Sequence, residues 1–285
     1  MKRTFAAALA VLSLALAATP ASAQLLAARE GPVVYGHHHI NVSDVDAHKK
    51  FWAEGLGGEP VKIGTSSAQI VKFPNVFVML SARAPSGGTK GSTVNHLGFQ
   101  VKDLRAALGR VKAAGFPIVT RDELPSEVSV TDGIASPNPN TSLAFLMGPD
   151  DTKVELIENK AAAQPIALHH VHFAAKDTEA MRAWYVKMFG AAPGMRGSFQ
   201  AADLPGVNLT YSPSTEPLAP TRGRALDHIG FEVKGLEAFI KRLEANGVKM
   251  DRELTPVPAL GLSIAFLTDP WGTYIELTEG FAAVP

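Results

Sequence analysis

The chain has 285 residues, and its 27 basic and 27 acidic side chains give a formal net charge of zero at neutral pH. Its lysines and arginines are scattered along the sequence rather than clustered, which argues against nucleic acid as a partner. The chain has no cysteine, so it offers neither disulfides nor thiolate ligands. Any bound metal must therefore be held by His, Asp or Glu.

Residues 1–23 have the pattern of a signal peptide. A basic start at Lys2 and Arg3 precedes an apolar run over residues 5–18, and Ala21-Ser22-Ala23 fits a small-residue cleavage site. A membrane anchor is the alternative, but this run is shorter than the roughly 20 residues that a span needs. We expect a periplasmic or secreted protein, with no membrane partner after cleavage. The rest of the chain is long enough for two compact domains.

The next part of the chain reads as short strands with two amphipathic helices. One helix should begin at Ser43 or Asp44 and end near Gly55. A second should cover residues 103–114, with Leu104, Leu108 and Val111 on one face. The pattern predicts strands over residues 39–42, 95–101, 143–147 and 153–157. The segment 124–140 between them is either a lid or a plain surface loop.

The remainder repeats this pattern. Val94-Asn-His-Leu-Gly-Phe returns as Leu226-Asp-His-Ile-Gly-Phe, and Leu143-Ala-Phe-Leu returns as Ile264-Ala-Phe-Leu. A weaker correspondence relates His39 to His170, which are 131 residues apart. We therefore predict two domains, 34–160 and 165–281, each made of two similar modules and joined by an Ala-rich linker that ends at Pro165.

Four histidines stand at the beginning of short apolar strands, and two glutamates lie in closing strands. Two imidazoles and one carboxylate with open positions suit a divalent catalytic metal such as Fe, Mn, Zn, Ni or Co. The alternative is that each is a satisfied structural or solvated side chain. Pairing them within each half predicts two metal sites, composed of His39, His96 and Glu155 and of His170, His228 and Glu276.

Other polar residues near these positions are candidates for supporting roles. His172 and Glu232 share a strand face with His170 and His228, so they are the predicted proton carriers. Gln100 occupies the place of Glu232 in its own module, as a substrate contact or a rim residue. Gly98 and Gly230 should clear space for a ligand or metal. The histidines His37, His38 and His169 precede the predicted strands and are expected to be solvated or to support the ligands.

These strings resemble the vicinal oxygen chelate superfamily, the glyoxalase, bleomycin-resistance and extradiol-dioxygenase group. The resemblance also rests on Ala183-Trp-Tyr-Val-Lys-Met-Phe-Gly and on Phe266-Leu-Thr-Asp-Pro-Trp-Gly-Thr-Tyr-Ile-Glu. It implies an α+β fold of four βαβββ modules, paired into two glyoxalase-like domains with cup-shaped mixed sheets. It also implies a divalent metal, held by residues of the first strand of each module and of the last strand.

Two departures from the family pattern limit what the resemblance implies. Glyoxalase-type sites take a carboxylate from the last strand of both paired modules, whereas Met79 and Thr210 stand at these places. Extradiol enzymes carry a tyrosine where this chain has Phe266, and no histidine lies between His228 and Glu276. The implied function is a metal-dependent lyase, isomerase or dioxygenase acting on a small molecule with vicinal oxygens. The alternatives are a non-catalytic periplasmic binding or resistance protein, or an enzyme in which one half is a silent copy.

Overall fold

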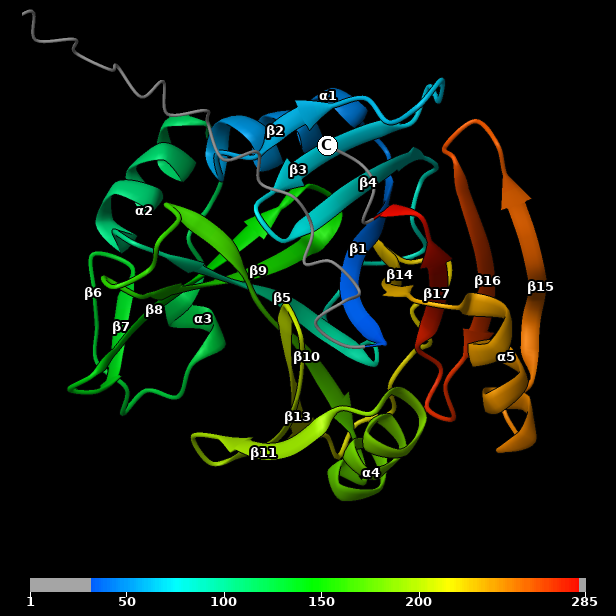
Figure 1. Ribbon diagram of the computed structural model, residues 1–285. Coiled ribbons are helices and arrows are strands. Elements are labelled where there is room, and N and C mark those ends of the chain that lie inside the picture. Colours follow the sequence, from blue (N-terminus) through cyan, green and yellow to red (C-terminus); the bar gives the residue numbers. More distant parts are fainter. Residues whose placement is uncertain (1–31, 282–285) are drawn as a thin grey trace, which may run out of the picture.

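The computed structural model describes residues 32–281, which form two mixed β-sheets with helices packed against them (Figure 1). The predicted signal peptide lies outside these residues. Within the described part of the chain, no helix has the length and apolar character needed to cross a bilayer.

Four modules follow one another, each beginning with a long strand and a helix. The first contains β1 (Val33–Val42), α1 (Val45–Lys49), the π-helical turn η2 (Lys50–Gly55), β2 (Glu59–Val61), β3 (Gln69–Phe73) and β4 (Val76–Ala82). The second contains β5 (Val94–Val101), α2 (Leu104–Ala113), α3 (Thr120–Glu123), β6 (Val130–Thr131), β7 (Ile134–Asn138), β8 (Thr141–Gly148), the 3-10 turn η3 (Pro149–Asp151) and β9 (Thr152–Glu158).

The other two modules repeat this order. The third contains β10 (Ile166–Ala175), α4 (Thr178–Phe189), β11 (Ala192–Arg196), β12 (Phe199–Leu204) and β13 (Val207–Pro213). The fourth contains β14 (Leu226–Val233), α5 (Leu236–Ala245), β15 (Met250–Val257), β16 (Leu262–Thr268) and β17 (Tyr274–Glu279). The α+β class and the four-module architecture are thus confirmed.

Three helices, α1, α2 and α4, begin at an aspartate that caps them. Asp44, Asp103 and Asp177 each accept hydrogen bonds from the first turn of α1, α2 and α4. Ser43, the other candidate for the first cap, instead donates to Asp150. The predicted apolar face of α2 is buried as expected. The segment 124–140 supplies the short strands β6 and β7, which extend a sheet beside β8.

The modules pair differently from the sequence prediction. Sheet I joins the first and fourth modules, with strand order β15-β16-β17-β14-β1-β4-β3-β2. Sheet II joins the third and second, with order β11-β12-β13-β10-β5-β9-β8-β7-β6. The expectation that the modules of 34–160 pair together, and likewise those of 165–281, is therefore wrong. The repeat identifies equivalent strands, but it does not show which of the first strands pair with one another.

The first strands of the first and third modules begin earlier than predicted. Val33, Val34 and Tyr35 pair with the far end of β14 and are buried, so β1 already contains His37 and His38. His169 likewise lies inside β10. The prediction that these histidines precede the strands is wrong, because the apolar residues before them continue the sheet.

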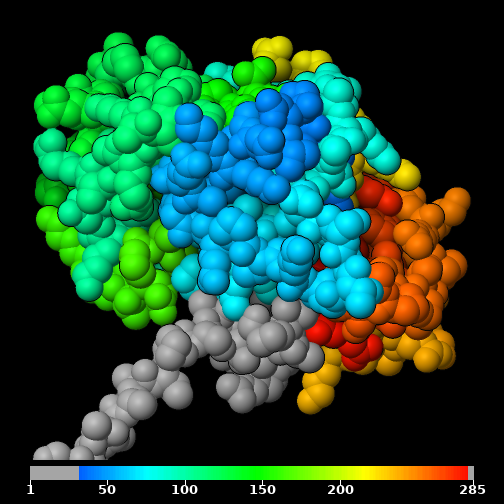
Figure 2. All heavy atoms as spheres, turned by 90° about the horizontal axis from the view of Figure 1, so that it is seen from above, coloured from blue at the N-terminus to red at the C-terminus, as the bar shows by residue number. Residues whose placement is uncertain are grey.

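One apolar core connects the modules. It includes Trp52, Phe99, Phe173 and Phe231, one from each module, all fully buried. In Figure 2 the blue and cyan surface of the first module lies between the green second module and the orange-to-red fourth module. The helix-covered faces of the sheets form this core, so the opposite faces are left to carry the polar side chains.

Candidate metal centres

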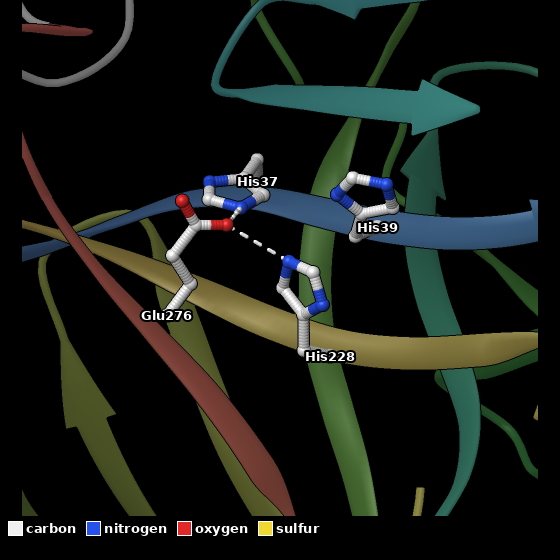
Figure 3. A group of neighbouring side chains, drawn as sticks. All are labelled: His37, His39, His228 and Glu276. Atoms are coloured by element: carbon white, nitrogen blue, oxygen red, sulfur yellow. Dashed lines mark hydrogen bonds and ion pairs between the residues drawn. The ribbon is translucent and has the colours of Figure 1, made fainter. Parts of the chain in front are cut away.

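The first cluster consists of His37, His39, His228 and Glu276, at the centre of sheet I (Figure 3). Glu276 Oε2 lies 2.9 Å from His37 Nε2 and 2.8 Å from His228 Nε2. His39 Nε2 hydrogen-bonds Ser81 Oγ at 2.6 Å, and its ring lies 4.4 Å from that of His228. One potential ligand atom from each of the four residues lies within 4.8 Å of the others.

The second cluster consists of His96, Glu155, His170 and His172, at the centre of sheet II, and repeats this geometry. Glu155 Oε2 lies 2.8 Å from His96 Nε2 and 3.1 Å from His170 Nε2. His172 Nε2 hydrogen-bonds the hydroxyl of Ser212. All four ligand residues are buried. Residues 32–281 therefore contain two clusters of three imidazoles and one carboxylate.

The clusters bring together all six predicted ligands but in different groups. His39 joins His228 and Glu276, whereas His170 joins His96 and Glu155. The two ligand sets predicted from the sequence are thus wrong in their grouping, because first-strand pairing runs between β1 and β14 and between β10 and β5. Each cluster also gains a fourth residue, His37 or His172.

The register explains why the sequence comparison placed these histidines incorrectly. His37 lies opposite Gly230 and His170 lies opposite Gly98, so these two histidines are equivalent. The true partner of His39 is then His172, at an offset of 133 rather than 131 residues. The offset of 131 holds only on the later strands, where Met79 is equivalent to Thr210.

Both glycines clear space for an imidazole. A Cβ built on Gly230 would overlap the ring of His37, and a Cβ on Gly98 would overlap the ring of His170. The glycines were predicted to clear space for a ligand or metal. The structure shows that the space is filled by a histidine ring of the neighbouring strand. His37 and His170 reach their clusters only because the facing residue has no side chain.

Other candidates lie outside the clusters. Glu232 is buried, and its carboxylate accepts hydrogen bonds from Thr278 Oγ1 and the Gly280 amide, which holds the end of β17. His38 points to the opposite face and bonds the Tyr35 hydroxyl at 2.6 Å. His169 Nδ1 lies 3.0 Å from His170 Nδ1, beside the second cluster. Gln100 accepts a hydrogen bond from Asn159.

The first cluster places an imidazole between two carboxylates. His228 Nδ1 donates to Asp227 Oδ1 at 2.7 Å, while Nε2 faces Glu276. Burial lowers the pKa of His228, but these carboxylates outweigh it and the net shift is upward. Burial raises the pKa of Glu276, yet His37 and His228 bring it well below its usual range. Asp227 also accepts from Asn41 and Gly223, so its orientation is fixed.

The second cluster has one carboxylate fewer around it than the first. Asn95 replaces Asp227 at the equivalent position, and its amide oxygen lies 2.9 Å from His96 Nδ1. Burial outweighs the neighbouring Glu155 and lowers the pKa of His96 to about 4. Burial and the neighbouring His96 and His170 also lower the pKa of His172. This cluster is therefore a set of neutral imidazoles around one carboxylate, which is the state in which imidazole binds metals.

The donor set fits a divalent metal. With Nδ1 of His228 committed to Asp227, its Nε2 is the atom that remains for a metal, as in carboxylate–histidine–metal arrangements. In the second cluster, Ser212 holds Nε2 of His172, while the buried Nδ1 has no hydrogen-bond partner among the described residues. A bound cation would satisfy that nitrogen. Imidazole and carboxylate ligands suit Zn, Fe, Mn, Ni or Co.

Asp227 and Asn95, which contact Nδ1 of His228 and His96, should influence the metal affinity of the two clusters. We expect Asp227→Asn to weaken metal binding at the first cluster by about 10–100-fold, because it removes the charge that orients His228. Asn95→Asp should strengthen the second cluster. Calorimetric titration of each chelator-treated variant with Zn²⁺ measures both effects. Equal affinities in Asp227→Asn and the unmodified protein would contradict this role.

Acid should destabilise the metal-free protein. Burial and the adjacent His228 and His37 lower the pKa of His39 to about 3, and burial lowers that of His96 to about 4. Between these values and the ordinary pKa of about 6.5, the unfolded chain binds more protons than the folded one, so stability decreases as the pH is lowered through this range. The raised pKa of His228 opposes this trend.

Urea unfolding of chelator-treated protein at pH 7.5 and 5.5 tests this expectation. The midpoint should be lower at pH 5.5, and His39→Gln should reduce the difference. A midpoint that rises on acidification would show that His228 dominates.

Comparison with known proteins identifies one family and several proteins of similar fold. The family model described as Glyoxalase/Bleomycin resistance protein/Dioxygenase superfamily matches residues 34–124 and 167–277. Glyoxalase I from Zea mays superposes with a TM-score of 0.65 at 19% identity, over 88% of this chain and 94% of that one. A mutant of the same maize enzyme gives 0.67 at 19% identity, over 90% and 96%.

A putative dioxygenase from Bacillus subtilis subsp. subtilis str. 168 gives a TM-score of 0.59 at 14% identity, over 87% of this chain and 86% of that chain. At such identities the likeness is one of fold. No curated protein matches the sequence.

Proposed function

The chain belongs to the glyoxalase/bleomycin resistance protein/dioxygenase superfamily, and we propose that it is an exported metal-dependent enzyme acting on a small molecule with two neighbouring oxygen atoms. Members of this superfamily are typically metal-dependent enzymes. The observation that carries the proposal is the repeated cluster of three imidazoles and one carboxylate, whose ligand atoms lie within 4.8 Å of one another.

The residues of each cluster have separable tasks in this proposal. The four cluster residues would hold the ion, which when bound supplies Lewis-acid chemistry, or redox chemistry where the metal is iron. Ser81 and Ser212 fix the rings of His39 and His172 through Nε2. His172, with Nδ1 unpartnered among the described residues, is the proposed ligand or proton carrier of the second cluster. Glu232 is not proposed for proton transfer, because it is engaged at Thr278 and Gly280.

Elemental analysis of protein purified without chelators tests the metal, and product analysis with and without O₂ separates lyase or isomerase chemistry from oxygenase chemistry. The proposal expects two divalent ions per chain. A chain that takes up none, even after incubation with Zn²⁺, Fe²⁺, Mn²⁺, Ni²⁺ and Co²⁺, would overturn it. Cell fractionation and N-terminal sequencing test export and cleavage after Ala23.

Binding without turnover is the second candidate function. It is favoured by a cavity of about 550 Å³ beside the first cluster, lined by His39, Met79, Ser81 and Gln69 among others. Such a volume suits a drug-sized ligand. If alanine at both His228 and Glu276 leaves ligand affinity unchanged, the binding role is preferred over the enzymatic one.

A further inference from the structure

The two clusters are similar, but the side chains around them differ in a consistent direction. Met79, in register with His39, is equivalent to Thr210, in register with His172. Lys153 and Tyr274 each stand two residues before the cluster glutamate on the same strand face. In both positions, the second cluster carries the more polar residue.

The third difference lies two strands beyond Met79 and Thr210, at the edge of each sheet. Val61 pairs with Ile70, which pairs with Met79; Gly194 pairs with Ala201, which pairs with Thr210. Two residues beyond Val61 and Gly194, the chain reaches Ile63, just after the end of β2, and Arg196, the last residue of β11. The wall beside Arg196 is built from Gly, Ala and Thr where sheet I has Val, Ile and Met, so it is smaller as well as more polar.

Ile63 and Arg196 have opposite surroundings. Ile63 is buried among the apolar side chains of Ile70, Phe77, Met79 and Phe266, next to the first cluster. The side chain of Arg196 is about one-fifth exposed, and its guanidinium lies 3.6 Å from Glu155 Oε1 and 3.5 Å from Thr210 Oγ1. Both contacts are long, so most of its five N–H groups are left for a ligand.

The charged side chains that contact cluster residues directly differ between the two clusters. Around the first, the carboxylates of Glu276 and Asp227 both contact His228, so two acidic side chains lie close to a divalent ion bound there. Around the second, Glu155 offsets only Arg196, since Asn95 is neutral. The nearby Lys153 is already paired with Glu123 at 2.9 Å. A bound divalent ion would leave positive charge uncompensated in a largely buried place, which favours an anionic ligand.

We propose that the second cluster binds a small carboxylate with an adjacent oxygen, that is, a 2-hydroxy or 2-oxo acid, and that Arg196 binds its carboxylate. This inference rests on the proposed metal-dependent function. A planar guanidinium fork suits a carboxylate, and a charge-assisted hydrogen bond is stronger than a neutral one.

The experiment compares lactate with lactamide, which have nearly the same shape and the same vicinal oxygens but differ in charge. Protein loaded with Co²⁺ is titrated with each, and the change in the visible Co²⁺ spectrum gives the affinities. Glu276→Gln protein confines the metal to the second cluster, and the unmodified protein is measured in parallel in case that variant folds poorly. Lactate should bind at least about tenfold more tightly than lactamide.

Arg196→Met should reduce this preference to less than about twofold without changing the Co²⁺ content, and Arg196→Lys should restore part of it. Arg222→Met is the matched control, because Arg222 stacks on Tyr274 near the first cluster. It should leave the preference unchanged. Equal binding of lactate and lactamide by metal-loaded protein, or an unchanged preference in Arg196→Met, would overturn this inference alone. Absence of bound metal would instead overturn the proposed function and this inference with it.

Discussion

Replacing Glu276 with glutamine should leave the chain with one bound divalent ion instead of two. Glu276 is the carboxylate of the first cluster, and its Oε2 lies within 3 Å of both His37 and His228. A neutral amide keeps the shape but loses the charge that attracts the cation. Mutation of a residue that only hydrogen-bonds to a metal ligand typically lowers metal affinity by about 10–100-fold. The loss of affinity at this cluster should be larger, because Glu276 is itself a proposed ligand. Elemental analysis after dialysis measures the remaining metal, and Glu155→Gln should empty the second cluster in the same way.

Glu237→Gln is the control for this result, because it removes the same charge from an exposed position on α5, where Glu237 pairs with Lys241. It should retain both ions. If Glu276→Gln and Glu237→Gln bind equal amounts of metal, the first cluster is not a metal site. If Glu276→Gln loses both ions, the two clusters are not independent.

Gly230→Ala should empty the first cluster although it alters none of its ligands. The added methyl group would overlap the ring of His37, which is fully buried. Either the ring or the strand must shift. We expect loss of the metal from this cluster and a destabilisation of about 1–3 kcal/mol, as is usual for overpacking. Metal analysis and urea unfolding of the metal-free protein measure the two effects separately.

Gly109→Ala provides the matched control, since Gly109 is exposed on α2 and its added methyl would meet nothing within 4 Å. It should keep both ions and be at least as stable as the unmodified protein, because alanine favours a helix over glycine. Gly98→Ala should reproduce the defect at the second cluster, through His170. Two retained ions and an unchanged midpoint in Gly230→Ala would contradict the close packing described above.

Local sequence patterns predicted many of the helices and strands and six of the eight residues that form the two clusters. The buried faces of α2 and α5 follow directly from the spacing of their apolar residues. The six predicted ligands all reached a cluster, because each is a polar residue on an otherwise apolar strand, a position that is costly unless the residue has a partner.

What the sequence did not yield depends on relations between distant strands. A repeat shows which strands are alike but not which of them pair, so the ligands were grouped incorrectly. His37 was missed because the strand was expected to begin at His39. The signal was present in Val33-Val34-Tyr35, three apolar residues that continue the strand backwards, and in Gly230, whose missing side chain the ring of His37 fills.

The nested pairing of the modules has a consequence for the order in which the chain folds. Sheet II is built from residues 94–213, a continuous stretch, whereas sheet I joins residues 33–82 to residues 226–279. As the chain emerges, sheet II and its metal cluster can form while the first module still lacks its partner. Sheet I requires contacts of high sequence separation, which form slowly. The exposed edge of β1 is therefore open to wrong pairing until β14 arrives, and the first cluster is the last place in the molecule where a metal can bind.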